Sequence, residues 1–282
     1  MSTTTTVPAG TTPGTASHVR PLAGPARADR PVPAPIPMGR LVAVEARKSF
    51  DTRSGLWLLA GIGILALLAT AATILWAPDD QLTYEQFASA IGVPMAIILP
   101  IIAVLSVTAE WSQRNGLTTF TLVPRRSRVI TAKLVVTVAV GVVSMLLAGA
   151  IGALGNVVGT AVAGTDLVWN VGVLELGGII LGNVLGMLVG FMLGVLLRSS
   201  PAAIVGYFVY SFVLPGLAEL LAQTQGWFAD LRPWVDFNFA TTPLFNGAMT
   251  PAAWAHLGVT GAVWLALPLA VGLWAVLRSE VK

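Results

Sequence analysis

Residues 110–133 read EWSQRNGLTTFTLVPRRSRVITAK, and this segment separates two long apolar runs that carry almost no charge. Its basic residues are Arg114, Arg125, Arg126, Arg128 and Lys133. Apolar runs of about 20 residues are long enough to cross a bilayer as helices. The pattern therefore predicts a membrane protein that holds a structured, basic loop on one side of the membrane.

The composition of the whole chain supports this interpretation. Hydrophobic residues make up 55% of the 282 residues, charged residues only 10%, and the mean hydropathy is +0.81. Since soluble domains average about a quarter charged residues, most of the chain is expected to face lipid or other apolar helices. The absence of cysteine excludes disulfides, and His18 and His256 lie too far apart to suggest a metal site. We expect neither a metal nor a cofactor.

Six apolar runs are long enough for membrane helices. The predicted fold class is an all-α membrane protein, with a six-span domain over residues 38–282. The predicted spans are residues 55–77, 87–108, 134–158, 174–197, 201–222 and 254–277.

The chain before the first span has two parts. Residues 1–37 are rich in Thr, Pro, Ala and Arg, contain no apolar core of a signal peptide, and are predicted to form a disordered cytoplasmic tail. After them, apolar residues recur at helical spacing, which predicts an amphipathic helix in the membrane interface. The apolar positions are Met38, Leu41, Val42, Ala46 and Phe50.

The distribution of basic residues predicts the orientation. With both termini in the cytoplasm, fifteen of the sixteen Lys and Arg residues are cytoplasmic, and only Arg232 is external. Because Lys and Arg bias sets membrane orientation, this topology is favoured. The long external segment 223–253 is aromatic and is expected to form short helices at the outer leaflet.

Glycines at a spacing of four mark one stripe of the fourth span, where small residues let helices approach closely. They are Gly178, Gly182, Gly186, Gly190 and Gly194. A surface that slides during transport is the alternative to simple packing. Charge is nearly absent inside the spans, and Glu175 and Glu219 near the outer boundary are the weak candidates for a substrate path.

The segment 44–59, VEARKSFDTRSGLWLL, followed by six spans and the basic loop, resembles the permease subunits of ABC-2-type exporters of the compact bacterial kind. In that family the loop between spans two and three forms a cytoplasmic coupling helix that sits in a groove of an ATPase subunit. Trp111 would be an apolar anchor in this loop. The family pattern matches Glu110, Gly116, Pro124 and either Arg126 or Arg128, leading to Lys133 at the next span. The loop itself adds Trp111 and the cations Arg114 and Arg125 to the candidate coupling residues.

The resemblance implies a transport subunit in the bacterial plasma membrane that pairs with a second permease, identical or not, and with ABC ATPase subunits. The chain contains no Walker A loop, so it is not expected to hydrolyse ATP itself. No nucleic-acid partner is expected. An autonomous secondary carrier or channel is the alternative, and an intramembrane enzyme would need a catalytic cluster that the sequence lacks. The substrate is not indicated.

Overall fold

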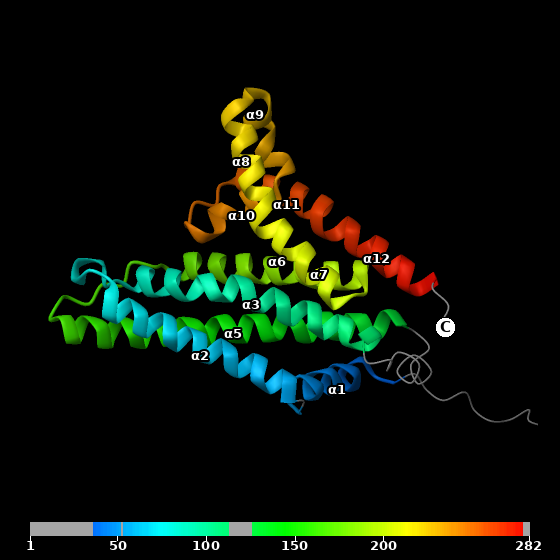
Figure 1. The fold of residues 1–282 in the computed structure, drawn as a ribbon, viewed down its shortest axis with the longest axis horizontal. Helices are drawn as coiled ribbons and strands as arrows, with labels where there is room; N and C mark the ends of the chain where they lie inside the picture. The colour runs from blue at the N-terminus through cyan, green and yellow to red at the C-terminus, as the bar shows by residue number, and fades with distance from the viewer. Residues whose placement is uncertain (1–35, 52, 113–125, 279–282) are drawn as a thin grey trace, which may run out of the picture. The chain divides into compact units, whose positions relative to one another are not determined.

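The computed structural model describes residues 36–51, 53–112 and 126–278, and within these ranges the chain is helical and without strands (Figure 1). Of the predicted N-terminal tail, residues 1–35 lie outside the described part. The elements are α1 (Met38–Asp51), α2 (Arg53–Trp76), η2 (Asp79–Gln81), α3 (Tyr84–Ser112), α5 (Arg126–Ala163), α6 (Val173–Leu197), α7 (Ser200–Phe208), η3 (Val209–Val213), α8 (Leu214–Thr224), α9 (Gly226–Val235), α10 (Phe237–Phe245), α11 (Pro251–Gly261), η4 (Ala262–Ala266) and α12 (Leu267–Arg278).

Six helical stretches among the described residues are long and apolar enough to span a membrane, which confirms the predicted all-α membrane fold. They cover residues 59–76, 84–109, 127–163, 173–197, 200–224 and 251–278. The third differs most from its prediction, because α5 has 38 residues. At 1.5 Å per residue it is about 57 Å long, well beyond the roughly 30 Å hydrocarbon core. The helix is therefore longer than the hydrocarbon core is thick, whereas the prediction covered only residues 134–158.

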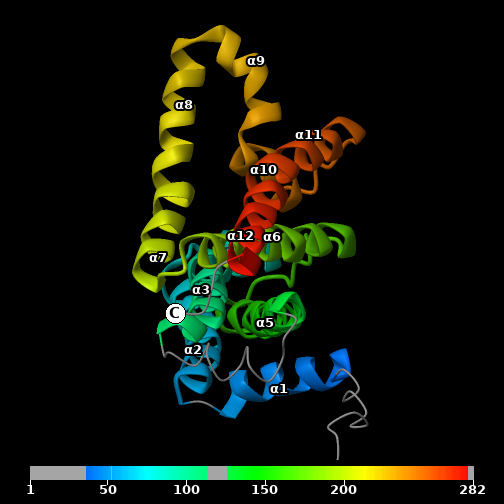
Figure 2. The ribbon, with the colours of Figure 1, turned by 90° about the vertical axis from the view of Figure 1, so that its right-hand side faces the viewer.

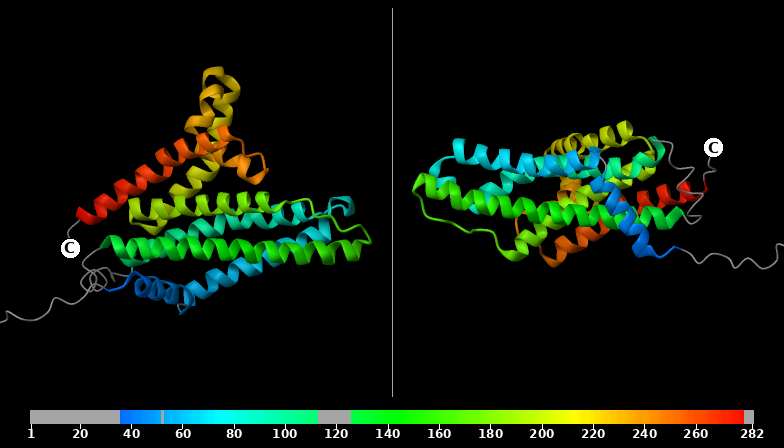
Figure 3. Two further views of the ribbon diagram at one scale, coloured as in Figure 1. Left: turned by 180° about the vertical axis from the view of Figure 1, so that it is seen from behind. Right: turned by 90° about the horizontal axis from the view of Figure 1, so that it is seen from below.

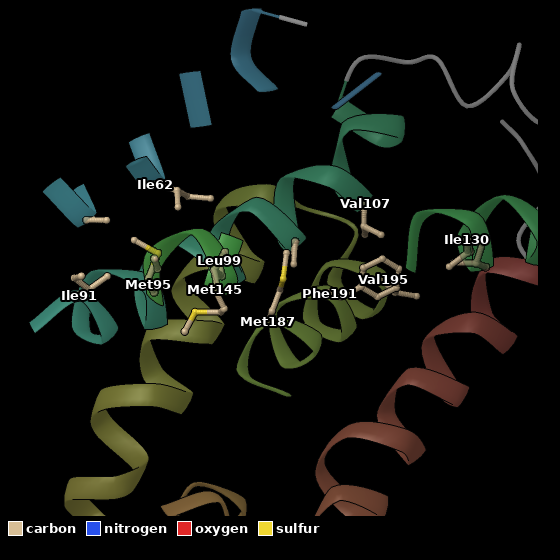
Figure 4. Close-up of a cluster of buried hydrophobic side chains, with 14 residues drawn as sticks. Ile62, Ile91, Met95, Leu99, Val107, Ile130, Met145, Met187, Phe191 and Val195 are labelled. Carbon is tan, nitrogen blue, oxygen red and sulfur yellow. The ribbon is translucent and has the colours of Figure 1, made fainter. Parts of the chain in front are cut away.

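The packed core lies between α3 and α6, with α2 and α5 against them. More than half of α6 is buried, whereas the fifth span is buried over only a small fraction of its length. Figure 4 shows the buried cluster at the centre of these helices, where Met95 and Leu99 of α3 meet Met187 and Phe191 of α6. All four side chains are fully buried, so the contact between α3 and α6 forms the centre of the core.

Pro100 shapes the contact between these two helices. Proline has no N–H, so the carbonyl of Ala96, one turn earlier, loses its helical donor. The Tyr207 hydroxyl of α7 donates to that carbonyl oxygen at 2.9 Å. On the opposing helix Gly190 lies directly against Pro100: an added Cβ would be 2.6 Å from the Pro100 carbonyl oxygen. A proline, a glycine and a tyrosine hydroxyl together make this close approach possible.

The fifth and sixth spans each contain a π-helical segment, η3 and η4. In each the backbone N–H of the following leucine reaches five residues back, from Leu214 to Val209 and from Leu267 to Ala262. Pro215 and Pro268 come next, and a proline ring disturbs the carbonyl four residues before it. Each widened turn therefore lies directly before a Leu-Pro pair, although the Leu99–Pro100 pair of α3 lies in regular α-helix.

The last part of the fifth span, α8, forms a helical hairpin with α9, and the chain returns through α10 to α11, the start of the sixth span (Figure 2). Helices α9 and α10 are hydrogen-bonded to the π-helical segments. The Asn238 amide donates to the Tyr210 carbonyl oxygen at 3.1 Å, and the Trp264 indole N–H donates to the Val235 carbonyl oxygen at 2.7 Å. Segment 223–253 thus consists of short helices, as the sequence predicted, and they are anchored to both flanking spans.

The glycines of α6 face two different neighbours. Added Cβ atoms would meet the Leu244 carbonyl oxygen at Gly178 and the Phe245 ring at Gly182, both on α10. At Gly190 and Gly194 they would meet α3. Gly186 differs, since a Cβ there would meet only the Tyr207 hydroxyl, at an ordinary 3.6 Å. Close packing therefore does not extend uniformly along the predicted stripe.

Candidate functional site at the basic end of the helices

Several helix ends lie together at one end of the structure, where hydrogen bonds and close contacts join them. The Thr108 and Ser200 hydroxyls lie 2.7 Å apart, which joins the end of α3 to the start of α7. Ser106 and Thr137 lie 3.3 Å apart and join α3 to the first part of α5. Gly272 of α12 packs on the end of α6. We call this side, together with α1, the basic end.

The described basic residues gather here almost without exception. They are Arg40, Arg47, Lys48, Arg53, Arg126, Arg128, Lys133, Arg198 and Arg278, whereas Arg232 lies in α9. Arg278, in the last turn of α12, stacks its guanidinium 4.4 Å from the centre of the Trp274 ring. An exposed tryptophan beside an arginine is the pairing that anchors a helix end at a membrane surface.

The opposite side collects acidic residues. The Asn170 amide donates to the Glu85 carboxylate at 2.8 Å, and the Tyr84 backbone N–H donates to the Val168 carbonyl oxygen at 3.2 Å. These bonds tie the start of α3 to the α5–α6 connection. The acidic residues on this side include Asp79, Asp80, Glu85, Asp166 and Glu175. The two ends of the helices therefore differ sharply in charge.

A buried ion pair connects α1 to α5 at the basic end. The Lys133 ammonium donates to Glu45 Oε2 at 2.7 Å, and the two side chains are only 7% and 10% exposed. Lys48, one turn along α1, donates to the other carboxylate oxygen, Oε1, at 2.9 Å. Figure 3 shows α1 lying across the start of α5, where this pair forms. The carboxylate thus receives two ammonium donors from different helices.

Sequence analysis had not selected Glu45 as a functional residue, although the sequence contains a signal for it. Glu45 stands three residues after Val42 and four after Leu41, so it shares a helix face with the apolar residues of α1. A carboxylate on the apolar face of an amphipathic helix must find a cation when that face is buried. The spacing shows that a partner is required, but it does not show which cation provides it.

A comparison with known protein families shows which family the chain belongs to. A family model described as "ABC-2 family transporter protein" matches residues 43–214, more than half of the chain. The chain belongs to the ABC-2 transporter family. The matched part of this ABC-2 protein begins inside α1, includes Glu45, Lys133 and the basic segment, and ends at the first residue of α8. The protein is therefore a membrane transport component. A search of curated proteins found no match.

The predicted coupling loop of the ABC-2 protein begins and ends at the basic end. Glu110 and Trp111 lie in the last turn of α3, while Arg126 and Arg128 lie in the first turn of α5. Four other predicted coupling residues lie outside the described residues: Arg114, Gly116, Pro124 and Arg125. The coupling helix itself stays a prediction.

The two glutamates proposed for a substrate path both lie away from the basic end. Glu175, in the first turn of α6, accepts from the backbone N–H of Gly172 at 3.4 Å. Glu219 of α8 pairs with Arg232 of α9 at 2.6 Å, and Arg232 also binds Asp236 at 3.1 Å. Both carboxylates therefore have local structural partners, and a role in substrate passage stays a prediction. Among the described residues no group of three metal-ligating side chains occurs.

Proposed function

We propose that this ABC-2 protein is the permease subunit of an ATP-driven exporter. It forms the substrate pathway with a second permease subunit, and separate ATPase subunits drive it through the loop between α3 and α5. The observation that supports this most directly is that α3 ends and α5 begins at the basic end, where α5 is paired with α1. The family membership and the lack of a Walker A loop agree with hydrolysis by another subunit.

The alternative, an autonomous carrier, finds less support in the buried side chains. Ion-driven carriers place ionisable groups near the bilayer midplane, where they bind the coupling ion. Among the described residues the buried ionisable carboxylate and ammonium are Glu45 and Lys133, and both lie at the basic end rather than in mid-span. Buried polar residues within the spans are threonine, serine and asparagine. A driving force from outside the chain is the simpler interpretation.

We expect the basic end to be cytoplasmic in the bacterial plasma membrane. The chain contains no cysteine, so single cysteines can be introduced at Asp79, Asp230 and Arg125 without a background. A membrane-impermeant maleimide should label the first two in intact cells and the third only after the membrane is opened, because Lys and Arg are retained inside. Labelling of Asp230→Cys only in opened cells would overturn this topology.

The proposal as a whole predicts a stable partner. When the affinity-tagged chain is purified from its native membrane in mild detergent, we expect a subunit with a Walker A loop to co-purify and the preparation to hydrolyse ATP. Substitution of the Walker A lysine in that subunit should abolish hydrolysis while the complex persists. Recovery of a folded permease without any ATPase subunit, across several mild detergents, would contradict the proposal.

A further inference from the structure

The buried pair between Glu45 and Lys133 poses a physical question, because it removes two charges from water. Replacing a buried ion pair by well-packed apolar residues is often neutral or stabilising, so such a pair is weak evidence for a contribution to stability. What a buried pair does restrict is where the two helices lie, because moving them apart would leave each charge buried without its partner. The pair at the basic end is short, at 2.7 Å, and joins residues 88 positions apart. Its effect is therefore to hold α1 at one position on α5.

The pair lies close to the point where the basic segment enters α5. Lys133 lies seven residues into α5, which begins at Arg126, so it is about 10 Å along the helix from the point where the segment enters. Its neighbours Val129, Ile130 and Ala132 are buried. Any movement of the segment is therefore passed to α5 within two helical turns of Lys133, the residue that contacts Glu45.

The helix α1 also packs on α2, the first span. α2 and α5 also pack directly on each other, so α1 adds a second connection between the first span and the start of α5 that lies outside the core between α3 and α6. Lys48 strengthens the α1 side of this route, because it donates to the second oxygen of the same carboxylate.

We propose that Glu45 and Lys133 are positioning residues that lock α1 to the start of α5, so that these two helices move as one unit during the ATP cycle. This inference rests on the proposed function, since it assumes a partner that moves the segment. It makes α1 part of the transmission to the first span, in addition to an anchor in the interface. Neither residue contacts the transported substrate in this proposal.

The test measures whether α1 and α5 keep a constant separation while ATP is bound and hydrolysed. Spin labels are placed on cysteines at Val44 of α1 and Val135 of α5, two exposed positions near the pair. Distances are measured by pulsed electron resonance in the full permease–ATPase complex, without nucleotide and after trapping with ATP and vanadate. In the otherwise native protein we expect one distance that is the same in both states.

Glu45→Gln removes the carboxylate and should make the distance depend on nucleotide or broaden it. The charge-swapped variant, Glu45→Lys with Lys133→Glu, should restore a single distance in both states. Arg47→Gln is the matched control, because it removes an exposed charge of α1 and should change nothing. An unchanged distance in Glu45→Gln would overturn the inference.

A second variant covers the case in which Glu45→Gln does not fold. Glu45→Met with Lys133→Met removes both charges of the pair, so the protein should retain its thermal stability while losing the constant distance. A constant distance in this variant would show that the charges are not needed for the lock. Failure of the proposed function gives a different result: no ATPase subunit is present, and no nucleotide-dependent change occurs anywhere in the permease.

Discussion

Replacing Gly190 by alanine will destabilise the protein more than the same change at Gly186. An alanine Cβ at position 190 would lie 2.6 Å from the carbonyl oxygen and 3.0 Å from the Cα of Pro100. These are backbone atoms of a core helix and cannot rotate away, so α3 and α6 must separate. Overpacking of this kind costs about 1–3 kcal/mol. The measurement is the midpoint of thermal unfolding in detergent, followed by size-exclusion chromatography.

Two controls in the same helix make the comparison strict. At Gly186 a Cβ would meet only the Tyr207 hydroxyl at 3.6 Å, and at Gly177 it would meet nothing within 4 Å. Alanine at either position should be neutral or stabilising, by up to about 1 kcal/mol, because glycine is a poor helix former. Equal midpoints for Gly190→Ala and Gly186→Ala would refute the close approach of α3 and α6. Sequence analysis alone would have placed the sensitive position anywhere on the stripe, Gly186 included.

The second large effect is expected at the coupling segment. The double variant Glu110→Lys with Trp111→Ala should insert normally but lose its ATPase subunit or its substrate-stimulated hydrolysis. Interfaces concentrate their energy in buried aromatic anchors, and loss of such an anchor costs about 2 kcal/mol or more, which is roughly a thirtyfold loss of affinity. Partner retention is measured by co-purification and hydrolysis by phosphate release.

The alternative explanation is that the arginines of the segment only bind anionic headgroups, worth about 1 kcal/mol each near the surface. The double variant separates the two explanations, because it makes the segment more basic and leaves lipid binding intact. Arg278→Gln is a suitable control, since this residue lies at the same end but on α12, beside Trp274. Normal partner binding and normal stimulated hydrolysis in the double variant would refute the coupling assignment.

The sequence by itself determined the membrane fold and the difference between its two ends. A span must contain about 20 apolar residues whatever it packs against, so run lengths alone predicted six helices. The bias of Lys and Arg likewise lies in the segments that connect the spans, so it can be recognised without knowing which helices pack together. The ends of α5 were the part it placed poorly, because the helix already begins among the basic residues at Arg126 and continues past Val158 to Ala163.

Which residues touch was decided by the tertiary structure. Four residues of an α-helix turn through about 400°, so each glycine of the α6 stripe is rotated about 40° from the one before it. Over the four glycines from Gly178 to Gly190 this drift carries the stripe from α10 to α3, and at Gly186 between them a Cβ would meet only the Tyr207 hydroxyl. Spacing alone does not contain the positions of the neighbouring helices.

The pairing of Glu45 with Lys133 was likewise decided by the tertiary structure. Its place on the apolar face of α1 requires a cation, but local sequence offers Lys48 one turn away and nothing that points to Lys133. Only the packing of α1 across the start of α5 brings Lys133 within 2.7 Å of the carboxylate. Local spacing decides which side chains share a face, whereas a contact across 88 residues exists only when the helices have packed, because it depends on where each helix lies in the folded protein.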